Sequence, residues 1–107
     1  MSQDINRLLM ALERSMREIN REVINPEIPA LTIDDLRPVL HLVAKARASY
    51  LKALLDLGAR VDDAQAANGE LGELAKLRRA YEELASAAKA LETAIQRGYL
   101  DIRVDGG

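Results

Sequence analysis

The sequence predicts an all-α fold: a three-helix bundle with a long antiparallel helical hairpin, coiled-coil-like packing and a shorter N-terminal helix. Three observations predict it. Apolar residues recur at seven-residue spacing in three separate stretches, which requires helices packed side by side. Proline and glycine signals separate those stretches. The apolar residues are mostly Ala and Leu, with three Tyr and no Phe or Trp, which suits closely spaced helices.

The first stretch predicts a helix over about residues 3–24. Its apolar residues follow alternating spacings of four and three: Ile5, Leu9, Leu12, Met16, Ile19 and Val23. Pro26 biases Asn25 away from helical geometry, and Pro29 prevents an early restart. Residues 25–31 are therefore expected to form a rigid linker that contains both prolines.

A second helix is predicted over about residues 35–67. Thr32 and Asp35 have the spacing of a capping box. Counted from a cap at Asp34 or Asp35, Pro38 falls in the first turn, where its missing N–H has no partner to lose. Regular helix is thus expected from about Leu36, and the apolar series continues through Val43, Tyr50, Leu57 and Ala64.

Two positions compete as the turn between the second and third helices. Gly58 could end the second helix, with Asp62 or Asp63 capping the next one. The apolar repeat passes through Gly58, however, and one interior glycine costs only about 1 kcal/mol. We therefore favour Asn68-Gly69 as the turn.

The third helix is predicted over about residues 70–97, with Gly98 as its stop. Its apolar series comprises Leu74, Leu77, Tyr81, Leu84, Ala88, Leu91 and Ile95. The tail, residues 99–107, alternates Leu100, Ile102 and Val104 with charged residues, as strands do. A single strand has no evident partner in a helical fold, so the tail is expected to lie across the bundle, to stay loose, or to pair with a second copy.

Composition narrows the classes of function. The 107 residues form a single domain, without cysteine, and have a formal net charge of −2. Disulfides and thiolate chemistry are excluded, and there is no bulk attraction to nucleic acid or to acidic membranes. The N-terminus has no signal-like pattern, and no apolar run is long enough to span a membrane. We expect a cytoplasmic protein with no cofactor.

A basic stripe on the second helix, made of Arg37, His41, Lys45 and Lys52, is a possible anion contact, and Arg47, outside the stripe, is a further one. The stripe could hold a phosphate backbone, which makes a nucleic-acid-binding hairpin one alternative function. Aromatic residues for base stacking do not flank it. The competing interpretation is pairing inside the hairpin, with Lys45 near Glu92 and Lys52 near Glu82 or Glu83.

Arg47 is unusual because the other members of its heptad series, Leu40, Leu54 and Val61, are apolar. Pointing inward, Arg47 would need a carboxylate or a bound anion; otherwise its head reaches out to solvent. A small ligand-binding protein or enzyme with a pocket near Arg47 is the second alternative. Glu70 and Glu73 lack a facing acidic pair, so neither a metal site nor a catalytic site is predicted.

The main hypothesis is a non-enzymatic protein–protein interaction or regulatory module, acting as a homodimer or bound to a partner protein. At about 30 Å the first helix is shorter than the hairpin, so apolar surface should remain uncovered. The residues expected at the contact are Leu8, Met10, Leu57, Val61, Leu71 and Leu74.

Overall fold

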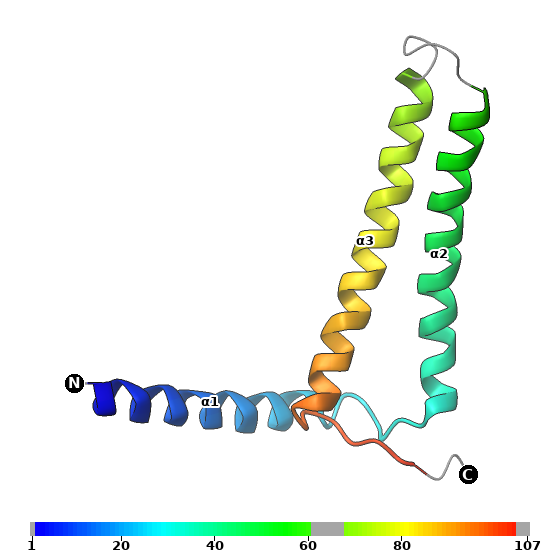
Figure 1. The fold of residues 1–107 in the computed structure, drawn as a ribbon. Coiled ribbons are helices and arrows are strands. Elements are labelled where there is room, and N and C mark those ends of the chain that lie inside the picture. The colour runs from blue at the N-terminus through cyan, green and yellow to red at the C-terminus, as the bar shows by residue number, and fades with distance from the viewer. Residues whose placement is uncertain (1, 61–67, 105–107) are drawn as a thin grey trace. The chain divides into compact units, whose positions relative to one another are not determined.

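The chain folds into three helices. The structure, a computed structural model, describes residues 2–60 and 68–104. The helices are α1 (Ser2–Ile24), α2 (Ile33–Arg60) and α3 (Asn68–Gln96). α2 and α3 pack against each other as an antiparallel pair (Figure 1), and α1 is shorter, with 23 residues against 28 and 29. The predicted all-α, three-helix fold is therefore confirmed.

The chain is divided into two compact units. One comprises Met1–Leu36 with Leu91–Gly107, and the other comprises Arg37–Ala90. The first unit holds α1, the linker after it, the first residues of α2, the last residues of α3 and the described part of the tail. The second unit holds most of the α2–α3 hairpin. No described helix combines the length and the apolar character needed to cross a membrane.

The start of α2 differs from the prediction because the helix is capped earlier. The Thr32 backbone N–H donates to Asp35 Oδ2 at 2.9 Å, and the Asp35 N–H is 3.3 Å from Thr32 Oγ1. This confirms the predicted capping box, but its cap is Thr32, so the helix begins at Ile33. Pro38 consequently lies beyond the first turn and has no N–H to donate to the carbonyl of Asp34.

The hairpin of the second unit is held by a seam of side chains that are only half-buried. In α2 they are Val39, Val43, Ala46, Tyr50, Ala53 and Leu57. In α3 they include Leu74, Leu77, Tyr81, Leu84 and Ala88. Two helices alone leave both edges of such a seam open to solvent. In this unit, none of the side chains that the structure describes is buried.

Neither predicted turn position separates α2 from α3. α2 continues past Gly58 to Arg60, and Asn68 and Gly69 are the first two residues of α3. Gly58 does not have a positive φ, so it continues the helix instead of ending it. Residues 61–67, including Ala64 and the predicted end of the second helix, lie outside the described residues.

Gly98 ends α3 as predicted. It has a φ of 73°, the left-handed conformation that glycine adopts without a steric penalty. The N–H of Gly98 donates to the Ile95 carbonyl at 3.1 Å, and that of Tyr99 donates to the Ala94 carbonyl at 2.9 Å. This pair of bonds is a Schellman motif, which turns the chain sharply out of the helix.

The tail after Gly98 has a partner within the chain, contrary to expectation. The Leu31 N–H donates to the Asp101 carbonyl at 3.0 Å, and the Arg103 N–H donates to the Leu31 carbonyl at 2.7 Å. Leu31 and Ile102 thus form an isolated parallel β-bridge. The partner is the linker after Pro29, whose extended backbone leaves the N–H and the carbonyl of Leu31 available for pairing.

Candidate interaction surface

The most prominent surface feature of the first unit is the apolar side of α1. We call it the α1 face, and it comprises Ile5, Leu9, Leu12, Met16, Ile19 and Val23. Spacings of four and three place these residues on one side of a helix. Each is between 44% and 62% exposed, and α1 contains no buried residue. Of the two predicted contact residues in α1, Leu8 is exposed beside this face and Met10 is exposed on the opposite side of the helix.

The α1 face is uncovered because α1 meets the rest of its unit through other residues. At its C-terminal end Asn20 and Ile24 are half-buried, as is Asn25 just beyond it. Ile19 and Val23, which lie between these positions in the sequence but on the α1 face, stay exposed. The junction therefore uses the side and the end of α1 and leaves the apolar face available.

Arg21 holds the end of α1 to the tail. Its Nη1 donates to the Gly98 carbonyl at 2.9 Å and its Nη2 to Asp101 Oδ1 at 3.0 Å. Asn25 Nδ2 reaches Asp101 Oδ2 at 3.4 Å. Hydrogen bonds from Arg21 and then from Asn25, with the positive charge of Arg21, hold the pKa of Asp101 below its ordinary value.

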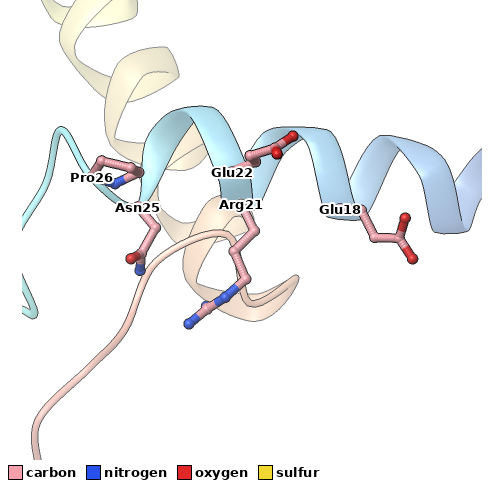
Figure 2. A pocket seen from close by; sticks show the side chains of 5 residues that line it. All are labelled: Glu18, Arg21, Glu22, Asn25 and Pro26. Atoms are coloured by element: carbon pink, nitrogen blue, oxygen red, sulfur yellow. The ribbon is translucent and has the colours of Figure 1, made fainter.

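A shallow hollow of about 590 Å³ lies beside this junction (Figure 2). It is lined by Glu18, Arg21, Glu22, Asn25 and Pro26. Figure 2 shows Arg21 and Asn25 on the side of the tail and the Glu22 carboxylate on the other side. Since Arg21 and Asn25 already bind Asp101, the hollow is a by-product of the junction and not a built ligand site.

The junction contains both residues that are buried in the described part of the chain. Leu100 is 3% exposed and Thr32 is 7% exposed. Thr32 is also the cap of α2, and its hydrogen bonds, from the backbone and then from the side chain, lower the pKa of Asp35. The tail thus supplies the one buried apolar side chain among the described residues.

The predicted basic stripe lies on an exposed side of α2. Arg37, His41, Lys45 and Lys52 are all exposed, as is Arg47. Lys52 Nζ lies 3.0 Å from Asp56 Oδ2, one turn along its own helix, so the expected pairing with Glu82 or Glu83 is replaced by a local one. Glu82 in turn lies 3.9 Å from Arg78. Side chains one turn apart on the same helix are neighbours, so they can pair independently of the side chains on the adjacent helix.

Arg47 contacts Tyr81 of α3. Its Nε and Nη2 donate to Tyr81 Oη at 3.3 and 3.2 Å, and its guanidinium carbon is 5.2 Å from the centre of the Tyr81 ring. Tyr81 stacks on Tyr50, with 6.1 Å between ring centres. Arg47 thus has a phenol of α3 as a partner, a pairing that heptad spacing alone does not reveal.

Four large apolar residues on a different exposed side of α2 were not predicted as contacts. We define the α2 outer face as Leu40, Ala44, Arg47, Leu51 and Leu54; its three leucines are half-exposed or more, as is neighbouring Leu55. The spacings of four and three in this series repeat those of α1. That periodicity was visible in the sequence, but the Leu40–Leu54 series was not proposed as a contact surface.

Three of the four remaining predicted contact residues are described by the structure: Leu57 in α2, and Leu71 and Leu74 in α3. Leu57 and Leu74 are half-buried in the hairpin seam, where they line one hollow of about 180 Å³. Leu71 is exposed, and Val61 lies outside the described residues. Glu70 Oε1 binds Arg60 Nη1 at 3.2 Å. Within residues 2–60 and 68–104, no three His, Cys, Asp or Glu side chains are grouped to hold a metal ion.

Fold and surface together define an all-α, three-helix protein with an amphipathic helix whose apolar face has no cover within its own unit. Comparison with protein families, with curated proteins and with solved structures finds no match for this chain. The two exposed apolar faces are therefore the features that bear on function.

Proposed function

We propose that this protein is a non-enzymatic protein–protein interaction module that forms a homodimer through the α1 face. One observation carries the proposal: the apolar repeat of α1 is complete from Ile5 to Val23, yet every side chain in it is exposed. Sustained heptad spacing of this kind is typical of helices that pack against another helix.

The area of the α1 face is sufficient for a specific interface. Seven large apolar residues, the six of the face with the flanking Leu8, expose about half or more of their surfaces. At roughly 100 Å² each, they present on the order of 700 Å². A standard protein–protein interface takes about 800 Å² from each partner. The face thus matches what one partner contributes to a stable complex.

The scarcity of buried side chains supports the same conclusion. Leu100 is the one apolar side chain below a tenth exposed in the part of the chain that the structure describes. Burial of apolar surface is the main favourable contribution to folding, and small domains have little of it to spare. Association that covers the α1 face would add the burial that the separate units lack.

The charges of α1 favour a protein surface over a lipid surface. Helices that lie on membranes carry excess Lys and Arg on the polar face and often Trp or Phe on the other. In α1, four arginines are balanced by Asp4 and three glutamates, and no aromatic residue is present. A neutral helix with an aliphatic face is suited to packing against another helix.

The test is to make the α1 face polar. Replacing Leu9 and Leu12 together by Gln removes two central leucines, while Arg7→Gln with Arg14→Gln makes a matched change on the opposite side of α1. Each leucine should contribute about 1 to 1.5 kcal/mol on burial. A twofold dimer contains both substitutions twice, so dimerisation should weaken roughly a thousandfold or more.

The masses of the natural chain and the two variants would be measured by sedimentation velocity over a range of concentrations. We expect a dimer for the natural chain and for the arginine variant, and a monomer of unchanged helicity for the leucine variant. A natural chain that sediments as a monomer at every concentration would refute the proposal.

A further inference from the structure

We infer that the α1 face of one chain docks on the α2 outer face of a second copy, and that the contact is reciprocal. The inference rests on the proposed function and names the surface that receives α1. A reciprocal contact of this kind closes a twofold dimer, because each chain offers one α1 face and one α2 outer face.

The two faces match in spacing and length. Both follow the four-and-three spacing that lets the side chains of one helix enter the gaps of another. The α1 face extends over 19 residues, from Ile5 to Val23, and the α2 outer face over 15, from Leu40 to Leu54, which are 18 and 14 steps along a helix. At 1.5 Å per residue these are about 27 and 21 Å, so α1 can cover the α2 outer face from end to end.

The charges beside the α1 face are acidic. The positions that directly flank it are Asn6, Glu13 and Asn20 on one side and Leu8, Ser15 and Glu22 on the other. The only charged residues among these six are therefore glutamates. Arg7, Arg14 and Arg21 repeat every seven residues on the opposite side of α1. Pairing α1 with another α1 would give the two glutamates no cation at the flanking positions.

The charged residue of the α2 outer face is basic. Arg47 is part of the face, and the positions that directly flank it, His41, Ala48 and Leu55 on one side and Val43, Tyr50 and Leu57 on the other, include no Asp, Glu, Lys or Arg. Charge complementarity across an interface selects partners and suppresses wrong ones. The basic α2 outer face therefore suits the acid-flanked α1 face better than a second α1 face does.

Glu13 and Arg47 are the central pair of this arrangement. Glu13 flanks the middle of the α1 face, and Arg47 is the middle residue of the α2 outer face. The two residues therefore approach each other whether the helices run parallel or antiparallel. Tyr81 Oη accepts from only two of the guanidinium nitrogens of Arg47, and a guanidinium has five N–H donors. Glu13 has an exposed partner, Arg17, at 3.4 Å, which is a weak contact. Both groups can thus take a new partner.

The test uses two single charge reversals, Glu13→Arg and Arg47→Glu, and then an equimolar mixture of the two variants. Alone, each variant places like charges in both contacts of its dimer, so its dimerisation should weaken roughly tenfold or more. In a mixed dimer, one contact joins the natural Glu13 to the natural Arg47, and the other joins the two reversed side chains. Both contacts are then attractive, and the mixture should recover the dimer mass.

Arg78→Glu, a matched reversal on the exposed side of α3, serves as the control and should leave the dimer unchanged. Circular dichroism checks that each variant keeps its helices. If the Arg47→Glu variant dimerises as strongly as the natural chain while the leucine variant is monomeric, the inference is overturned and the proposed function stands. If the equimolar mixture dimerises no more strongly than each variant alone, the inference is also overturned, because α1 would then be docking within its own chain or elsewhere. A monomeric natural chain would refute the proposed function itself.

Discussion

The burial of Leu100 predicts that one side chain in the tail contributes strongly to stability. Leu100 is 3% exposed, whereas Val104, four residues later in the same tail, is 94% exposed. Leu100→Ala removes three buried carbons and leaves a cavity, and changes of this kind cost about 2 to 5 kcal/mol. Val104→Ala removes two carbons that are already in water, so its cost should be close to zero.

The surroundings of Leu100 give a closer value for the stability that Leu100→Ala should lose. Among the described residues, Leu100 and Thr32 are the two buried side chains, so the cavity would lie in a small junction with exposed neighbours that can partly relax. We therefore expect about 3 kcal/mol, in the lower half of the range. With a slope of about 1.5 kcal/mol per molar urea, the midpoint of unfolding should fall by roughly 2 M.

The assay is urea unfolding followed by circular dichroism at 222 nm, at one fixed protein concentration because association shifts the apparent stability. Hydrogen exchange at the amides of Leu31 and Arg103, which join linker and tail, gives an independent measure. Both amides should exchange faster in Leu100→Ala and at the natural rate in Val104→Ala. Equal midpoints and equal exchange for the two variants would show that burial of Leu100 does not hold the tail in place.

Two further predictions concern Asp101 and the glycines. Arg21→Gln should raise the pKa of Asp101 toward its ordinary value, as a carboxyl NMR titration would show. Because that pKa is lowered in the folded chain, the contact stabilises the fold above the ordinary pKa and is lost as the pH falls through the lowered one; an unchanged titration would contradict the assigned cause. Gly58→Ala should raise stability by up to about 1 kcal/mol, since its added Cβ meets nothing within 4 Å, whereas Gly98→Ala should cost roughly as much at its φ of 73°. Thermal melting compares the two, and an equal effect would contradict the assigned role of Gly98.

Local sequence patterns predicted most of the fold, and the features that they did not predict depend on contacts between residues far apart in the sequence. Heptad spacing located all three helices because it reports which side of a helix is apolar, a property of neighbouring residues. The capping box of Thr32 and Asp35 was also a local signal. Pro38 was misplaced because the prediction started α2 two or three residues too late.

The same reasoning explains what was missed at the candidate interaction surface. The bridge between Leu31 and Ile102 joins segments 71 residues apart, and no pattern in either segment names the other. Likewise, Arg47 finds Tyr81 only because α2 and α3 are antiparallel in one register. Leu8 and Met10 were predicted to be exposed because they lie outside the main apolar stripe of α1, which is a local property. The exposure of the whole stripe depends on which residues form the junction, and periodicity does not report that.

The junction also constrains the order in which the protein can fold. Each helix needs only contacts a few residues apart, so α1 and the hairpin helices can form quickly. Arg21 binds Gly98 and Asp101 across 77 and 80 residues, and closing a loop of that length must precede any gain from the contact. During synthesis the junction has to wait until residues 98–103 have left the ribosome, long after the α1 face is complete. Nascent chains on one messenger RNA would therefore display exposed α1 faces to one another before any of them has closed its own junction.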